Sequence, residues 1–262
     1  MSDTPPRPYP GEFLRVTIGS TIHGLHVPGT DDLDLMGVCI EPATEALGLG
    51  HPFEQHVYRT QPEGQPSGPG DIDLTTYSLR KYLRLAANGN PTVLNLLFVP
   101  PEHRHIDGPL GEELRSCIPL IVSREAARKY RGYLQAQKER LLGIRGQKHT
   151  GYTRRLKYQA EGGWDAKYAM HMVRLGVQGV ELLETGRITL PMVENREEVY
   201  AVRRGLVPLE ECVAWAERLE ARLEALETSS PLRPHPDRLA LDDWLVRTYL
   251  KGWAVTEQSI PR

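Results

Sequence analysis

The spacing of hydrophobic residues changes near Tyr77, and this change constrains the fold more than any other feature of the chain. Before it, apolar and β-branched residues form short runs at 13–18, 33–40 and 72–76, a pattern typical of strands. After it, apolar residues recur at every third or fourth position, a pattern typical of helices. Strands followed by helices predict an α+β fold with a helical C-terminal half.

The helical part divides at residues that start or stop helices. Asn90-Pro91 ends the first helix, Ser123 and Asp165 are predicted N-caps, and Gly186 is a predicted stop. Residues 143–163 are rich in glycine and charge and predict a connection. Helices are therefore expected at 77–89, from 91 to about 98, from 123 onward, and at 165–183, 208–227 and 239–253.

Length and composition limit the class of protein. At about 150 residues per domain, 262 residues suit one large domain or a catalytic domain with a helical partner. Hydrophobic residues at 40% and charged residues at 25% are typical of globular chains and exclude a coiled coil or wholesale disorder. Apolar stretches such as 91–101 are too short to cross a bilayer, and residues 1–10 lack a signal-peptide pattern. We expect a cytoplasmic protein with no membrane segment.

Cysteine and histidine spacing excludes the common zinc and disulfide patterns. Cys39, Cys117 and Cys212 lie far apart with no C-x-x-C pair, so buried free thiols are expected. His103 and His105 have no third ligand at zinc spacing.

The net charge is −2, so the chain lacks the overall basicity of a general nucleic-acid coat. Charge is nevertheless uneven: residues 123–160 hold eleven Lys or Arg against two acids, a local charge of +9. Such a segment predicts one surface that faces a polyanion.

An acidic pattern near the N-terminus indicates metal chemistry. Gly19-Ser20 is followed, after eleven residues, by Asp32-Leu33-Asp34. Alternation along a strand places both carboxylates on one face, about 6.5 to 7 Å apart along the strand. Carboxylate oxygens suit Mg²⁺, and phosphoryl transfer with two metal ions needs such ligands. Asp73 is predicted to supply a third carboxylate that also accepts a proton, with Asp71 as the alternative.

Other residues suit an anionic substrate. Gly19 and Ser20 end a strand with backbone N–H groups and a hydroxyl, which can hold phosphates. The basic pair Arg80 and Lys81 can serve either substrate, or can simply be an exposed pair at a helix start.

Five further segments accompany the acidic pattern between about residues 16 and 236: GSTIHGLHVPGTDDLDLMGV, YSLRKYLRLAANGNPTVL, YRGYLQAQ, KYAMHMVRL with GVELLETGRITLP, and VRRGLVPLEE. Together they resemble the DNA polymerase beta-like nucleotidyltransferase superfamily. Within it they are similar to the predicted nucleotidyltransferases, or RNA repair pathway DNA polymerase beta family. One departure is Asn95, where relatives tend to carry Glu.

The resemblance implies site residues, a mixed sheet and a cofactor. Asp32, Asp34 and Asp73 would bind Mg²⁺ or Mn²⁺, as two ions, and Gly19 and Ser20 would hold the triphosphate. Lys167, His171 and Arg174 match the K-x-x-x-H-x-x-R pattern of the family and share one helical stripe, so phosphate contact is implied. A solvated face is the alternative for that stripe. Tyr130 and Tyr133 match a family segment but are expected to be packing residues.

These observations predict transfer of a nucleoside monophosphate from an NTP to a hydroxyl acceptor, an RNA end, with release of pyrophosphate. The catalytic domain is expected at 1–120 and a helical domain that completes the nucleotide site at 121–262. Three alternatives remain: modification of a protein or metabolite, a non-catalytic nucleotide-binding module, and a two-metal phosphohydrolase.

Overall fold

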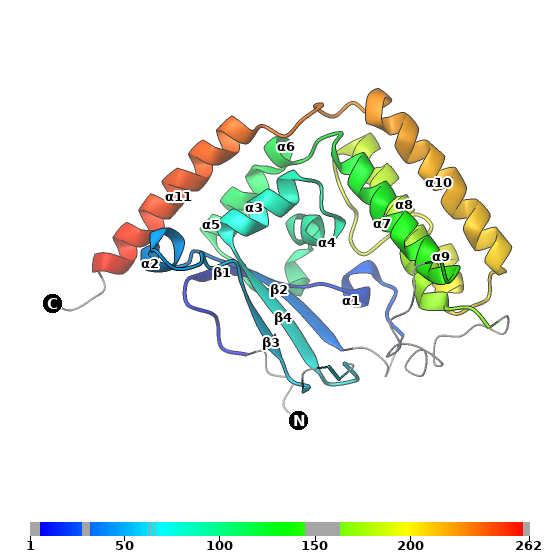
Figure 1. Ribbon diagram of the computed structural model, residues 1–262, viewed down its shortest axis with the longest axis horizontal. Coiled ribbons are helices and arrows are strands. Elements are labelled where there is room, and N and C mark those ends of the chain that lie inside the picture. Colours follow the sequence, from blue (N-terminus) through cyan, green and yellow to red (C-terminus); the bar gives the residue numbers. More distant parts are fainter. Residues whose placement is uncertain (1–5, 28–31, 63, 66, 145–162, 259–262) are drawn as a thin grey trace.

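The computed structural model describes residues 6–27, 32–62, 64–65, 67–144 and 163–258 (Figure 1). A mixed five-stranded sheet forms its base, with the strand order β3-β4-β2-β1-β5. Strands β2 and β4 run parallel, and the other neighbouring pairs are antiparallel. The strands are β1 (Glu12–Thr17), β2 (Leu33–Cys39), β3 (Gln55–Arg59), β4 (Ile72–Ser78) and β5 (Arg104–Ile106).

Helices gather on one side of the sheet, and the described chain after β5 contains helices and no further strand (Figure 1). This arrangement confirms the predicted α+β fold with a helical C-terminal half. Short 3-10 turns cover Asn95–Phe98 and Pro101–His103. The helices are α1 (Ser20–His23), α2 (Ala43–Leu47), α3 (Leu79–Ala87), α4 (Pro91–Leu94), α5 (Pro109–Ser116), α6 (Ile118–Ile121), α7 (Ala126–Leu141), α8 (Ala166–Thr185), α9 (Arg196–Arg203), α10 (Leu209–Ser229) and α11 (Arg238–Gln258).

The three predicted strands are present, and two others were not predicted. Every residue of β3 is exposed, so this edge strand carries no apolar alternation. Strand β5 has only three residues. Strand β4 continues to Ser78, whose side chain accepts a hydrogen bond from the Lys81 N–H and caps α3, so Tyr77 belongs to the strand.

One predicted helix cap is correct and one is wrong. The Asp165 side chain accepts hydrogen bonds from the N–H groups of Lys167 and Tyr168, and Gly186 ends α8 in the left-handed conformation. Ser123 does not cap α7, because a turn separates them: the helix begins at Ala126, whose N–H donates to the Ser123 carbonyl.

Helix α8 lies between α7 and α10, and two glycines permit this close packing. A methyl group on Gly179 would lie 2.7 Å from the ring of Tyr130 in α7. A methyl group on Gly176 would lie 2.8 Å from Leu219 in α10. Tyr130 is fully buried, as its predicted packing role requires, whereas Tyr133 is 37% exposed and does not fit that prediction. Elsewhere on α8, Arg174 and Gln178 contact His23 near the start of the chain.

A single large hydrophobic core joins the sheet to the helices. Met36 and Val38 of β2 belong to it, whereas Leu35 of β2 joins Ile72 and Leu74 in a small cluster on the other face. The three cysteines are buried and free, as expected. In the part of the chain that is described, no helix has the length and apolar character that crossing a membrane requires.

Candidate active site

Three carboxylates meet at the edge of the sheet where β2 and β4 begin. Asp34 and Asp73 are direct partners in the parallel register, because both strands start at this edge. Asp32 precedes Asp34 by two residues, and one oxygen of each carboxylate lies within 4.8 Å of the others. Among the described residues, this is the group of His, Cys, Asp and Glu side chains that can hold a metal ion, and neither His103 nor His105 belongs to it.

Gly19 lies against this acidic group, between β1 and α1. Its φ of 75° and ψ of −156° are nearly exclusive to glycine. The neighbouring Ile18 N–H donates to the Asp34 carbonyl at 2.8 Å, which ties the end of β1 to β2. A Cβ atom on Gly19 would collide with the Asp34 carboxylate. Glycine is thus required here both for the backbone conformation and for the room that Asp34 occupies.

Replacing Gly19 by alanine should therefore damage both the fold and the acidic group. We expect Gly19→Ala to lower the free energy of unfolding by about 1–3 kcal/mol, because the backbone conformation disfavours a side chain. We also expect weaker Mn²⁺ binding, because Asp34 must move. Urea unfolding and Mn²⁺ titration measure the two effects. Gly50→Ala, where a methyl group meets nothing within 4 Å, is the control, and unchanged Mn²⁺ affinity in Gly19→Ala would contradict the expectation.

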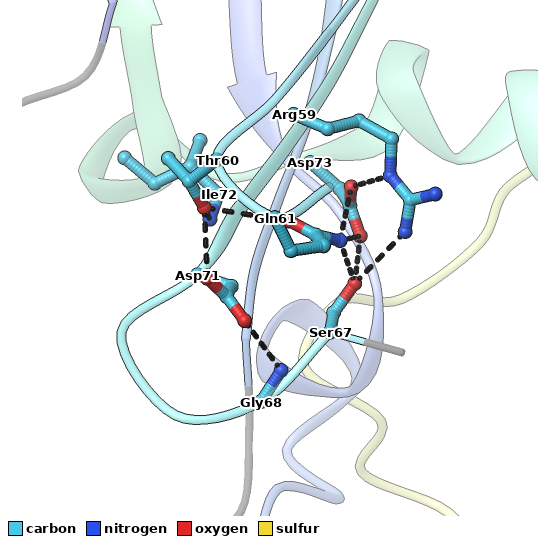
Figure 2. A network of polar contacts seen from close by, with 8 residues as sticks. All are labelled: Arg59, Thr60, Gln61, Ser67, Gly68, Asp71, Ile72 and Asp73. Carbon is cyan, nitrogen blue, oxygen red and sulfur yellow. Dashed lines mark hydrogen bonds and ion pairs between the residues drawn. The ribbon is translucent and has the colours of Figure 1, made fainter. Parts of the chain in front are cut away.

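Asp73 is held by three donors from β3 and the loop that follows it (Figure 2). Arg59 Nε donates to Oδ1 at 2.5 Å, and Gln61 Nε2 lies 3.0 Å from Oδ1 and 3.2 Å from Oδ2. The Ser67 hydroxyl donates to Oδ2. Burial opposes ionisation, but the hydrogen bonds from Arg59, Ser67 and Gln61 outweigh it and lower the pKa of Asp73. A carboxylate offers about four acceptor positions, so these contacts use them all.

A cavity of about 220 Å³ opens between the sheet edge and α8. It brings together residues that are up to 157 positions apart in the chain. Five predicted site residues line it: Gly19, Ser20, Asp34, His171 and Arg174. Pro91, Thr92 and Asn95 form another part of its wall.

Arg174 is held by neutral partners rather than by an acid. Its Nη1 lies 2.8 Å from Gln178 Oε1 and 2.8 Å from His23 Nε2. Burial, together with the nearby charges of Arg174 and His171, lowers the pKa of His23 well below its usual range, so this ring is neutral. Burial also lowers the pKa of Arg174 to about 10, which leaves it charged at neutral pH.

The guanidinium of Arg174 has hydrogen-bond donors to spare. Its Nε is buried and makes no hydrogen bond, and within the described residues no carboxylate pairs with it. Arg174 is half-buried, and a cation held partly out of water without a counter-charge is unfavourable. The arrangement is therefore suited to an anionic ligand that enters the cavity.

The structure does not bring every predicted residue to the cavity. Lys167 lies one turn before His171 on α8 and is absent from the cavity wall. Arg80 and Lys81 begin α3, beyond the far end of β4 from Asp73. Lys81 Nζ instead lies 2.8 Å from Glu54 Oε2. At about 3.3 Å per residue, the length of β4 separates this basic pair from the carboxylates.

Asp71, the alternative third acid, is used elsewhere. Its Oδ2 accepts from the Gly68 N–H at 2.9 Å, and its Oδ1 accepts from the Thr60 hydroxyl at 2.9 Å (Figure 2). Asp71 thus shapes the loop after β3, and the acidic group contains Asp73 instead.

The basic segment is partly neutralised by α10. Arg131 Nη1 lies 2.7 Å from Glu227 Oε1, and Lys138 Nζ lies 2.8 Å from Glu217 Oε1. Arg128 also pairs with Glu227. Five further basic residues of this segment lie outside the described residues: Arg145, Lys148, Arg154, Arg155 and Lys157.

Sequence reasoning missed several residues at the site. His23 and Gln178 support Arg174, and Arg59, Gln61 and Ser67 hold Asp73. The spacing of Gln178, one turn after Arg174 on the same stripe, is the one signal that could have indicated its role. The others reach the site through tertiary contacts that leave no local pattern.

Comparisons with known proteins identify a family for this chain. The model of a family described as the RNA repair pathway DNA polymerase beta family matches residues 13–247. An uncharacterized 38.9 kDa protein of the nrdC-mobD intergenic region of enterobacteria phage T4 is 32% identical over 84 residues, which span 32% of this chain and 24% of the phage protein. The crystal structure of a nucleotidyltransferase-like protein from Exiguobacterium sibiricum 255-15 aligns over 84% of this chain and 70% of that one. Its identity is 16% and its TM-score 0.30, so that likeness adds nothing to the assignment.

Proposed function

The chain belongs to the RNA repair pathway DNA polymerase beta family, and on that premise we propose that it transfers a nucleoside monophosphate from an NTP to a hydroxyl acceptor. Pyrophosphate is the second product, and an RNA end is the proposed acceptor. One observation supports this most: Asp34 of the acidic group lines the same cavity as His171 and Arg174 of α8. A triphosphate bound there would meet a metal-binding group together with the Arg174 guanidinium and the His171 ring.

The acidic group fits a divalent cation. Its three carboxylates have oxygens within 4.8 Å of one another. One of them, Asp73, already binds a positive group, the Arg59 guanidinium. Asp32, Asp34 and Asp73 would hold Mg²⁺ or Mn²⁺, which we propose as two ions. When bound, such ions neutralise charge on the transferring phosphoryl group.

The protein groups have separate proposed roles. Gly19 and Ser20 bind the triphosphate together with Arg174, which His23 and Gln178 orient. His171 contacts phosphate from the cavity wall, and Lys167 adds positive charge one turn earlier on α8. Asp73 accepts the proton that leaves the acceptor hydroxyl. No role at the cavity is proposed for Arg80 and Lys81.

Arg59 should compete with a metal ion for Asp73, because every acceptor position of that carboxylate is in use. The pair is partly exposed, at 37% for Arg59 and 24% for Asp73, so its worth is about 1 kcal/mol. We expect Arg59→Ala to bind Mn²⁺ about fivefold more tightly in the absence of nucleotide. Electron paramagnetic resonance of free Mn²⁺ measures this.

Arg84→Ala is the matched control, because Arg84 pairs with Glu54 and does not contact the acidic group. Its Mn²⁺ affinity should equal that of the wild type. Weaker Mn²⁺ binding in Arg59→Ala would show instead that Arg59 holds Asp73 in the orientation that a metal ion requires.

The support for RNA as the acceptor comes from the family description and not from the charge of the described surface. The family description refers to RNA repair. Three of the five basic residues of α7 pair with acids of α10, which reduces the attraction of this helix for a polyanion. A protein or a metabolite as the acceptor is therefore an explicit outcome of the test.

The test incubates the purified chain with each α-³²P-labelled NTP, Mg²⁺ or Mn²⁺, total RNA and total protein. Asp32→Ala serves as the inactive control. Label in RNA that is absent from the control supports the proposal, and label in protein identifies a protein-modifying enzyme instead. NTP binding with no labelled acceptor indicates the binding module, and pyrophosphate release with no labelled acceptor indicates a phosphohydrolase.

The division into a catalytic domain at 1–120 and a helical domain at 121–262 is part of this proposal. Its support is that α8 lies in the second part and contributes His171 and Arg174 to a cavity whose other walls lie in the first. A cytoplasmic location is likewise proposed.

A further inference from the structure

Helix α11 has one packed side and one open side. Leu241, Thr248 and Tyr249 are buried, and the helix packs against α3 and α6. The Tyr249 hydroxyl donates to the Glu41 carboxylate, and Trp253 Nε1 donates to the Glu41 carbonyl, each at 2.8 Å. These contacts fix α11 at the outer edge of the molecule (Figure 1).

The open side of α11 carries an apolar stripe. Leu239, Val246 and Leu250 are 85%, 56% and 60% exposed. They stand at i, i+7 and i+11, which places them along one line of a helix. Single exposed apolar side chains are common, but an aligned set on a helix is typical of a surface that another helix covers.

The apolar surface continues from this stripe onto α2. A second cavity, of about 300 Å³, opens between the two helices, and Leu47 of α2 lines it together with Val246 and Leu250. Leu47 is itself exposed. A partner on this side would therefore meet apolar residues of both helices.

Charged residues beside the stripe indicate which partner fits. Arg247 Nη2 lies 2.7 Å from Asp243 Oδ2, and both side chains are about two-thirds exposed. The acid precedes the base by four positions, so the two lie along the same edge of the stripe. A second copy of α11 that runs antiparallel reverses this order. The acid of each copy then lies opposite the base of the other.

One register suits both the apolar and the charged residues. Residues at the same level of an antiparallel pair have position numbers with a constant sum. Leu239 with Leu250 gives 489, and Asp243 with Arg247 gives 490. The twofold axis then passes close to position 245, and the two copies of Val246 lie beside it. The face is therefore complementary to itself, as a twofold interface requires.

We propose that two copies of this chain associate through the open side of α11 in this antiparallel register. A helix of 21 residues is about 31 Å long. The contact is therefore small beside the roughly 1,200 Å² of a stable interface, and the dimer forms reversibly as concentration rises. No described residue of α11 lines the cavity of the candidate active site, so this inference is independent of the proposed function.

Sedimentation velocity at increasing protein concentration tests the association. We expect the wild type to approach twice the mass of one chain as its concentration rises to about 500 µM. Leu250→Glu should weaken association at least about tenfold, because it places two carboxylates in the apolar contact. Leu206→Glu makes the same change at an exposed leucine beyond the end of α9 and should associate as the wild type does.

Two charge variants test the register. Asp243→Lys and Arg247→Asp each bring like charges together across the twofold axis, so each should weaken self-association about tenfold. An equal mixture of the two variants should associate as the wild type does, because each supplies the charge that the other lacks. Both side chains are exposed, so thermal melts should show both variants folded.

Three results would overturn the inference. A wild type that stays monomeric at the highest concentration would show that this face does not bind a second copy. A dimer that Leu250→Glu leaves intact would use another surface. A mixture that associates no better than Asp243→Lys and Arg247→Asp do separately would contradict the antiparallel register.

Discussion

Asp34→Asn is expected to lower kcat for nucleotidyl transfer by about a thousandfold. Asp34 is the carboxylate that both joins the acidic group and lines the cavity. A bound metal ion contributes several kcal/mol of charge stabilisation in the transition state, and about 4 kcal/mol corresponds to three orders of magnitude in rate. Single-turnover transfer of the α-³²P label to the acceptor measures the effect.

The fold should survive this substitution. Asn has the size of Asp, and the backbone bond from the Ile18 N–H to the Asp34 carbonyl does not involve the side chain. Removal of one of three neighbouring like charges also relieves repulsion. We therefore expect the melting temperature in EDTA to be no lower than that of the wild type.

Asp71→Asn is the matched control, because Asp71 lies two residues from Asp73 but outside the acidic group. We expect it to keep kcat within about fivefold, since such a change leaves the metal ligands in place. If Asp71→Asn were as inactive as Asp34→Asn, the assignment of the third carboxylate to Asp73 would be wrong.

The arrangement of the acids could be predicted because strand geometry is local. Alternation places Asp32 and Asp34 on one face, and the structure brings their oxygens within 4.8 Å of each other and of Asp73. The pairing of Asp34 with Asp73 needed only that β2 and β4 be parallel neighbours. Family resemblance indicated the stripe of α8, two of whose residues line the cavity.

The partners of these residues could not be predicted, because they depend on tertiary contacts. Arg59 reaches Asp73 through β3, an exposed edge strand without apolar alternation. His23 reaches Arg174 across 151 positions of the chain. The local charge of +9 was counted over residues 123–160 alone. It therefore omitted the acids of α10, which pair with Arg131 and Lys138.

Arg174→Met is expected to weaken NTP and pyrophosphate binding about a hundredfold. Hydrogen bonds to charged groups are worth about 1.5–3 kcal/mol each, and a bidentate guanidinium contact lies at the upper end of that range. His23 and Gln178 hold the guanidinium at the cavity, and its Nε has no other partner. Calorimetric titration with pyrophosphate tests the cavity independently of any acceptor.

Arg174→Lys should recover only part of this affinity. An ammonium group restores the charge, but it lacks the planar fork that can contact Gln178, His23 and phosphate together. Arg204→Met, at the exposed end of α9, removes the same charge away from the cavity and should bind pyrophosphate as the wild type does. If Arg174→Met also bound pyrophosphate normally, the unpaired guanidinium would not be a phosphate site. The triphosphate would then have to lie elsewhere along the acidic edge of the sheet.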